Sequence, residues 1–136
     1  MKRKNTKILK SKSRYPESAL QMQVVQWFRY QHTQYAGHFF AIPNEAKRSF
    51  ALANRLRKMG MLSGVSDLFL AVPRSIFHGM FIELKAGKNK ATPAQVDFML
   101  RMRAESYRVV VLNKFEDVVE EINSYLSLDG VKCQMK

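Results

Sequence analysis

Two opposite charges interrupt an apolar run at Met80-Phe81-Ile82-Glu83-Leu84-Lys85. If this run is a strand, its side chains alternate between two faces, so that Glu83 and Lys85 share one face while Ile82 and Leu84 share the other. A carboxylate and an ammonium group would then point the same way from a sheet. The pair predicts either a same-face ion pair near a strand end or two groups that take part in chemistry.

Asp67 stands immediately before a second apolar run, Leu68-Phe69-Leu70. Aspartate is depleted in strands unless it makes a turn, caps a helix or has a function. If the two runs pair as a hairpin, Asp67 lies beside Glu83, and the two carboxylates repel each other. A divalent cation such as Mg²⁺ relieves this repulsion, and it can polarise a phosphodiester and lower the pKa of a bound water while a nearby lysine orients that water.

Helix and strand signals alternate along the chain. Helical spacing or a strong start signal predicts four helices: 17–31, 46–59, 93–104 and 115–126. Short apolar runs predict four strands: 38–42, 67–72, 80–85 and 107–112. The order α-β-α-β-β-α-β-α predicts an α/β fold, in which helices flank a central mixed β-sheet of about four strands.

Several residues indicate how these elements begin, end and pack. Thr92 can cap free backbone N–H groups, and Pro93 fits the first position of a helix. Gly60 ends the second helix, whose apolar residues lie on one face: Leu52, Leu56 and Met59. The last helix turns five apolar residues inward: Val118, Val119, Ile122, Tyr125 and Leu126. Val109-Val110-Val111 predicts a buried strand, and Trp27 is most simply a core residue.

The 136 residues fit one domain, and 23 Lys and Arg against 11 Asp and Glu give a formal net charge of +12. Seven of the basic residues precede residue 15 with no acid among them: Lys2, Arg3, Lys4, Lys7, Lys10, Lys12 and Arg14. Such a segment cannot bury enough surface to fold. We therefore expect a basic disordered arm over 1–14, a single domain over 15–128 and a C-terminal tail over 129–136.

The charge favours nucleic acid as a partner, since neutralised phosphates release counterions. Further basic clusters support this expectation: Arg55-Leu56-Arg57-Lys58, residues 85–90 and Arg101-Met102-Arg103. A solubilising tail, or a tail that seeks a membrane surface, is the alternative explanation for the basic arm. Basic charge by itself predicts binding and not chemistry.

The composition excludes several other classes. A single cysteine, Cys133, excludes a disulfide within the chain, and the three histidines have no metal-binding spacing: His32, His38 and His78. No apolar run approaches the ~20 residues that span a bilayer, and no signal peptide follows the basic start. We expect a cytoplasmic protein with no membrane partner and no small-molecule cofactor.

The motifs together resemble the PD-(D/E)XK nuclease superfamily and, within it, the VRR-NUC (virus-type replication-repair nuclease) family. The resemblance covers residues 17–126 and rests on these stretches: Glu17, Pro43-Asn44, Gly60 to Leu68, His78 to Lys85, and Thr92-Pro93-Ala94-Gln95. Their order and spacing make the combination specific, although no single motif is. Ser66 stands where the family usually has proline, which we expect to change the turn and not the chemistry.

The resemblance implies a restriction-endonuclease-like core and a Mg²⁺- or Mn²⁺-dependent nuclease that cuts DNA. It implies Asp67 and Glu83 as metal ligands, with Glu17 and the backbone carbonyl of Leu84 in support. Lys85 would be the catalytic lysine, and Gln95 would contact Lys85 or the metal-bound water. Structured or branched DNA, such as flaps and junctions, is the expected substrate in replication, repair or recombination, in a bacterial or phage-infected cell. A homodimer would place two sites on two strands.

Each transferred role has a structural alternative. Glu17 could be a first-turn acid favoured by the helix dipole, and Gln95 could be a solvent-facing helix residue. The predicted nucleic-acid contacts of the body are Asn44, Arg48, Lys88 and Lys90. Asn44 could instead be only a turn residue, and Arg48 only a residue at a helix start.

Two other functions remain open on the sequence alone. The chain could be a non-catalytic nucleic-acid-binding module in which the acidic pair is structural. It could also be a small basic RNA-associated protein, in which case Asp67 with Glu83-x-Lys85 would be a coincidence. A binding surface, however, gains nothing from two carboxylates that face phosphate without a metal.

Overall fold

A four-stranded mixed sheet forms the centre of the molecule in a computed structural model that describes residues 16–43 and 49–130. The strands, in spatial order, are β1 (Phe39–Ala41), β2 (Leu68–Leu70), β3 (Met80–Leu84) and β4 (Arg108–Leu112). β1, β2 and β3 pair antiparallel, whereas β3 and β4 pair parallel. The predicted mixed α/β architecture is confirmed. Asn44, Arg48 and the arm over 1–14 lie outside the described residues.

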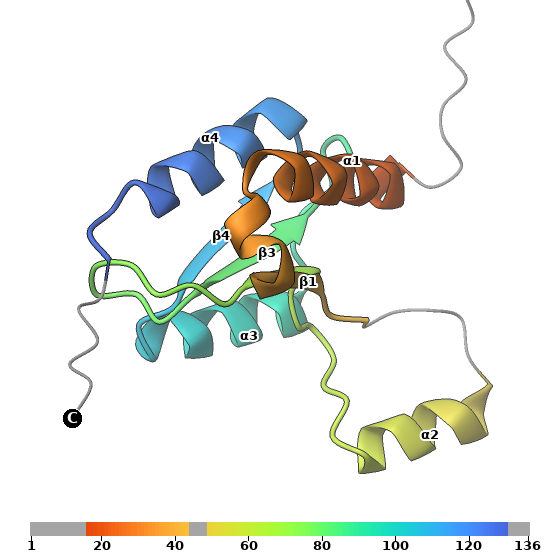
Figure 1. Cartoon of the computed structure of the whole chain (residues 1–136). Coiled ribbons are helices and arrows are strands. Elements are labelled where there is room, and N and C mark those ends of the chain that lie inside the picture. The colour runs from red at the N-terminus through yellow and green to blue at the C-terminus, as the bar shows by residue number, and fades with distance from the viewer. Residues whose placement is uncertain (1–15, 44–48, 131–136) are drawn as a thin grey trace, which may run out of the picture.

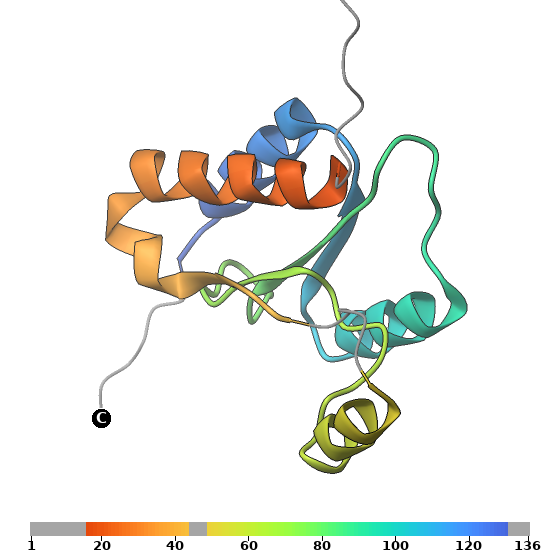
Figure 2. The ribbon, with the colours of Figure 1, turned by 90° about the vertical axis from the view of Figure 1, so that its right-hand side faces the viewer.

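Helices cover both faces of this sheet. The helices are α1 (Pro16–Gln31), the short 3₁₀ helix η1 (Thr33–His38), α2 (Phe50–Lys58), α3 (Pro93–Ala104) and α4 (Phe115–Leu126). α1 and α4 lie side by side on one face and α3 lies on the other (Figures 1 and 2). η1 was not predicted. It includes His38, which was expected to be the first residue of the strand, so β1 begins at Phe39 instead. No helix in the described part of the chain is long and apolar enough to cross a membrane.

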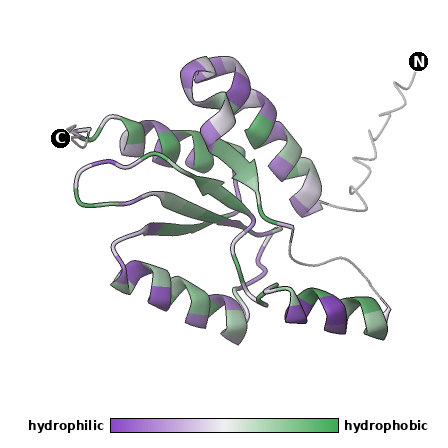
Figure 3. Ribbon diagram, turned by 60° about the horizontal axis from the view of Figure 1, so that its bottom comes forward, coloured by the Kyte–Doolittle hydropathy of each residue, from purple (hydrophilic) through white to green (hydrophobic). Residues whose placement is uncertain are grey.

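The alternation of side chains along the strands divides the core in two. The larger cluster joins the sheet to α1 and α4 and includes Val24, Phe28, Leu68, Ile82, Leu84 and Ile122. The smaller cluster lies on the face of α3: Phe81, Phe98, Met99 and Val109. Figure 3 shows the strands as mostly apolar, while the helices carry both apolar and polar residues. Glu83 and Lys85 follow Phe81 by two and four residues, so their side chains leave the strand on the same face as Phe81, which is the face that α3 covers.

One helix is not buried by the rest of the fold, and one expectation about burial was wrong. The apolar face of α2 does not pack on the sheet, because α1 and α4 fill one side and α3 the other. No residue of α2 is buried, Met59 is 71% exposed, and the helix stands away from the sheet (Figures 1 and 2). Val111 was expected in a buried strand but is 39% exposed, since β4 lies at the edge of the sheet. Trp27 is only half-buried and packs against the larger cluster.

The chain after α4 returns to the turn between β2 and β3. Ser75 N donates a hydrogen bond to the carbonyl of Asp129 at 2.7 Å, and Arg74 forms an isolated β-bridge with Gly130. Tyr125, at the end of α4, donates a hydrogen bond to the carbonyl of Val72 at 2.6 Å. The last helix is thereby fixed to the end of β2 that lies away from Asp67.

Gly64 lets the loop before β2 press against the start of α3. Its φ is +87°, and a Cβ at this position would lie 2.4 Å from the carbonyl carbon and oxygen of Ala94 and 2.8 Å from Gln95 N. Gly60 also has a positive φ, of +101°, but nothing lies within 4 Å of its would-be Cβ. A side chain at Gly60 would therefore strain only the backbone, whereas a side chain at Gly64 would also clash with α3.

We expect Gly64→Ala to destabilise the protein more than Gly60→Ala does. Gly60→Ala should cost about 1 kcal/mol through backbone strain, whereas Gly64→Ala should cost about 3 kcal/mol because the loop must also move away from α3. The free energy of unfolding in urea measures both effects. Equal losses in the two variants would contradict the close packing of Gly64.

Candidate active site

One cleft gathers the residues that the sequence predicted to be catalytic. It is a hollow of about 440 Å³ bounded by α1, the end of β1, the start of β2, the end of β3 and the start of α3. Five of its lining residues are the predicted ones: Glu17, Asp67, Glu83, Lys85 and Gln95. The structure therefore brings together side chains that are up to 78 positions apart in the sequence.

The register of β2 and β3 places Asp67 beside Glu83. Leu68 pairs with Ile82 in the antiparallel ladder, and Asp67 and Glu83 are the next residues outward from that pair. Asp67 Oδ2 accepts a hydrogen bond of 2.7 Å from the backbone N–H of Leu84. The half-buried aspartate is thus fixed to the strand that carries Glu83 and Lys85, as the predicted hairpin requires.

Glu83, Lys85 and Gln95 form a small buried network, with 2%, 8% and 9% of their surfaces exposed. Gln95 Nε2 donates a hydrogen bond to Glu83 Oε1 at 2.6 Å, and Lys85 Nζ donates one to Gln95 Oε1 at 2.7 Å. Lys85 Nζ also lies 3.2 Å from Glu83 Oε1. Every pair among the three side chains is in contact, so the position of each depends on the other two.

The start of α3 holds Gln95 in this network. Thr92 is the N-cap, and its side chain accepts a hydrogen bond from Gln95 N at 3.3 Å. In return, Gln95 Oε1 accepts one from Thr92 N at 2.8 Å, which completes a capping box. The same amide oxygen accepts the hydrogen bond from Lys85. A local helix-capping motif therefore also orients the lysine.

The environment of Glu83 disfavours its charged form. Burial, followed by the negative charge of Asp67, raises the pKa of Glu83 from 4.5 to about 7, although the hydrogen bond and the charge of Lys85 oppose this rise. Glu83 Oε2 is buried and has no hydrogen-bond partner among the described residues. A cation at Oε2 would satisfy the unpaired oxygen and favour the ionised carboxylate.

The donor set fits a hard divalent cation. Asp67 and Glu83 supply carboxylate oxygens, which Mg²⁺ and Mn²⁺ prefer, and Glu17 lines the same cleft. Glu17 Oε1 accepts a hydrogen bond of 3.1 Å from Ala86 N. Within residues 16–43 and 49–130 no three Asp, Glu, His or Cys side chains group closely enough for a metal. The arrangement thus offers two carboxylates, the number typical of Mg²⁺ sites that water and phosphate oxygens complete.

Other predicted contacts lie outside the cleft. Lys88 and Lys90 are exposed on the loop between β3 and α3 and do not line it. Leu84 contributes its backbone N–H to Asp67, while the role of its carbonyl stays a prediction. Ser18 and Gln21 line the cleft and were not predicted. Gln21 lies four residues after Glu17, and this helical spacing, which puts both on one face, was the available signal.

Comparisons with known proteins show the family of the chain. A family model described as the VRR-NUC domain matches residues 4–115, so the chain belongs to the VRR-NUC family. A solved structure described as a VRR_NUC domain protein is similar at a TM-score of 0.75 and 27% identity, over 85% of this chain and 91% of that one. A second, described as a VRR_NUC domain, has a TM-score of 0.52 and 21% identity, with coverages of 81% and 97%. No curated protein matches the chain.

Family membership confirms the resemblance seen in the sequence. The chain carries a nuclease-family domain, whose substrate is nucleic acid. The second solved structure supports the fold alone at its level of identity. The cleft described above lies within the matched residues.

In EDTA, the protein should lose stability as the pH rises from about 5 to about 8. The folded state keeps a proton on Glu83 up to about pH 7, whereas the unfolded chain releases it near pH 4.5. Ionisation of Glu83 therefore has no effect on stability below the lower pKa, and stability is lost as pH rises from the lower pKa through the upper one. Glu83→Gln should remove a loss on the order of 3 kcal/mol.

Thermal unfolding of the two proteins across this pH range measures the difference. Glu121→Gln is the matched control, since it neutralises an acid that pairs with Arg108 on the surface. Parallel pH profiles for the wild type and Glu83→Gln would contradict the raised pKa.

Proposed function

We propose that the chain is a Mg²⁺- or Mn²⁺-dependent nuclease that hydrolyses phosphodiester bonds in DNA. The observation that carries this proposal is the convergence of Asp67, Glu83 and Lys85 on one cleft, with Glu83 Oε2 buried and unpartnered among the described residues. Structured or branched DNA, such as flaps and junctions, is the proposed substrate, and a homodimer is the proposed form on such DNA. These last two proposals rest on the resemblance to the family.

The acidic residues would hold the cation. Asp67 and Glu83 are the proposed ligands, Glu17 would support them from α1, and the carbonyl of Leu84 is a further proposed ligand. A bound cation would polarise the phosphodiester and lower the pKa of a water molecule. Asp67 is already oriented by Leu84 N, so it would need little rearrangement to bind.

Lys85 supplies the positive charge that acts on the phosphate. Its ammonium group is held at 2.7 Å by Gln95 Oε1 and at 3.2 Å by Glu83 Oε1. A fixed ammonium group in a cleft stabilises the negative charge that develops on the phosphate oxygens, and it can orient the attacking water. Gln95 is a positioning residue, because it acts through Lys85 and Glu83.

Charge outside the cleft would attract and hold the DNA. The net charge of +12 raises the local concentration of a polyanion. The proposed phosphate contacts are the seven basic residues of the arm with Asn44, Arg48, Lys88 and Lys90. These contacts would position the backbone while the acidic cleft faces one phosphodiester bond, since phosphate contacts fix position without reading sequence.

Labelled duplex, single-stranded, flap and four-way-junction DNA are compared as substrates, and we expect the flap and the junction to be cut fastest in Mg²⁺ or Mn²⁺ and no DNA to be cut in EDTA. Asp67→Asn should remove a proposed ligand and Lys85→Ala the ammonium group, so each should slow cleavage by about 100-fold or more. Glu121→Gln, which neutralises an acid that pairs with Arg108 and does not line the cleft, should cut like the wild type. Gel electrophoresis of the products measures the rates.

The outcome that contradicts the proposal is binding without turnover. Tight, salt-sensitive binding to every DNA with no cutting in either metal would make the chain a binding module. Cleavage at the wild-type rate by Asp67→Asn and Lys85→Ala would show that the active site is not this cleft.

Gln95→Ala should lower the rate of cleavage by about 10- to 100-fold, in the range of residues that orient catalytic groups. Binding of DNA in EDTA should change little, because Gln95 is 9% exposed and contacts Lys85 and Glu83. Gln95→Glu tests the effect of a negative charge at this position. The new carboxylate can still accept a hydrogen bond from Lys85, but it can no longer donate one to Glu83 and repels it. Wild-type rates in both variants would show that the network does not position Lys85.

A further inference from the structure

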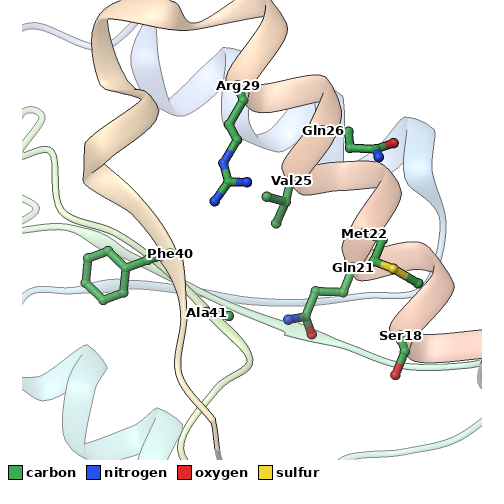
Figure 4. A pocket seen from close by; sticks show the side chains of 8 residues that line it. All are labelled: Ser18, Gln21, Met22, Val25, Gln26, Arg29, Phe40 and Ala41. Carbon is green, nitrogen blue, oxygen red and sulfur yellow. The ribbon is translucent and has the colours of Figure 1, made fainter.

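A second hollow continues the candidate active site along α1. It has a volume of about 440 Å³ and lies between α1 and β1, as Figure 4 shows. Three of its lining residues, Ser18, Gln21 and Ala41, also line the cleft that holds Glu83. A DNA strand that lies in the cleft can therefore continue along the surface into this α1–β1 groove.

The side chains of α1 that face the groove carry hydrogen-bond donors. Gln21 and Arg29 reach from α1 toward β1, and Ser18 adds a hydroxyl group (Figure 4). Arg29 is exposed, and no ion pair between described residues involves it. None of the described residues that line the groove is acidic. The guanidinium group of Arg29 is therefore available to a bound anion.

The edge of the sheet adds a backbone donor. In the ladder between β1 and β2, Ile42 N donates a hydrogen bond to the carbonyl of Asp67 at 2.9 Å. The carbonyl of His38, near the other end of this ladder, accepts one from Ala71 N at 2.8 Å. Hydrogen-bonded pairs alternate along an antiparallel ladder, so the N–H of Ala41 points away from β2, to the open side of the edge strand β1.

We propose that the α1–β1 groove binds the phosphodiester backbone of the DNA strand that enters the candidate active site, with Arg29 as the contact to one phosphate. This inference rests on the proposed function and adds a second phosphate site to it. Arginine can donate two parallel hydrogen bonds to one phosphate, and the Gln21 amide and the Ala41 N–H can contact phosphates nearer to the cleft. The ring of Phe40 points away from α1 and packs on Phe69, so the groove offers no aromatic face to a base. The contacts therefore depend on neither base sequence nor base pairing.

The length of α1 sets the position of the phosphate that Arg29 contacts. Gln21, which also lines the cleft, precedes Arg29 by eight residues, so the two lie roughly 12 Å apart along the helix, at about 1.5 Å per residue. Phosphates of one strand follow each other at about 3.4 Å along a duplex axis, so Arg29 reaches a phosphate about three to four linkages from the scissile bond. Because the groove leaves the cleft in one direction, this contact lies on one side of the scissile bond only.

Neutral methylphosphonate linkages test this position. A labelled DNA is cut in Mg²⁺ after one linkage at a time, on either side of its main cleavage site, has been made neutral. A neutral linkage about three to four positions from the scissile bond, on one side, should slow the wild type by about 10-fold. Arg29→Ala should cut unmodified DNA about 10-fold more slowly than the wild type and show no further loss at that linkage, because the contact is already absent.

Matched variants separate the contact from net charge and from folding. Arg29→Lys keeps the positive charge but not the paired donors, so it should retain part of the loss at the same linkage. Arg108→Ala also removes one positive charge, but Arg108 lies on the opposite edge strand and pairs with Glu121. This control should show the same pattern of losses as the wild type. Thermal unfolding shows whether each variant is folded.

Binding in EDTA, where no cleavage occurs, tests the groove separately from the nuclease. Fluorescence anisotropy with a blunt DNA duplex at increasing KCl measures how the affinity depends on salt. One phosphate contact contributes about one unit to the slope of log affinity against log salt, so Arg29→Ala should reduce this slope by about one. Arg108→Ala should leave it unchanged. A reduced slope in Arg29→Ala with no cleavage by the wild type would support the groove and contradict the nuclease.

The inference is overturned if Arg29→Ala leaves the salt slope unchanged, or if it loses rate at the same neutral linkage as the wild type. It is also overturned if Arg29→Ala changes only the oligomeric state, which would make the groove an interface between copies of the chain. In each of these cases, metal-dependent cleavage by the wild type would still support the nuclease.

Discussion

The side chain of Glu83 leaves β3 toward α3 and is buried, and only one of its two carboxylate oxygens has a hydrogen-bond partner among the described residues. Oε1 accepts from Gln95 and lies against Lys85, while Oε2 has no partner among the described residues. Burying an ionised carboxylate in this way costs free energy, and for the same reason the pKa of Glu83 is raised to about 7. Carboxylates with a perturbed pKa cluster at functional sites. The rest of the cleft is arranged around this residue.

The fold holds the cleft together through contacts that also stabilise the protein. The β2–β3 ladder sets Asp67 beside Glu83, and the hydrogen bond from Leu84 N fixes the aspartate there. The capping box of α3 orients Gln95, which in turn holds Lys85. Gly64 allows the loop before β2 to touch the backbone of Ala94 and Gln95. The catalytic geometry proposed for this family member is therefore a consequence of strand register and helix capping.

Sequence reasoning succeeded where local signals and tertiary packing agree. The order of elements and the Thr92 cap follow from alternation and capping rules, and the structure confirms them. The contact of Gln95 with Lys85 was implied only by the family resemblance, and the structure contains it. It failed for Val111, because an apolar run does not show that its strand lies at the edge of the sheet. For α2, the spacing showed which face is apolar but not whether a neighbour covers that face. The burial of Glu83 Oε2 without a partner among the described residues depends on residues far apart in sequence, so no local pattern could predict it. The catalytic roles came from the resemblance and remain predictions.

The central claim is that Asp67 and Glu83 hold a divalent cation. Crystals of the protein soaked in Mn²⁺ test it directly, because anomalous scattering at the manganese edge locates the ion without any assumption about activity. The account predicts one anomalous peak within coordinating distance of Asp67 and Glu83, lost in crystals of Asp67→Asn. A protein that binds no Mn²⁺ at these carboxylates, or binds it equally well after Asp67→Asn, would contradict the account.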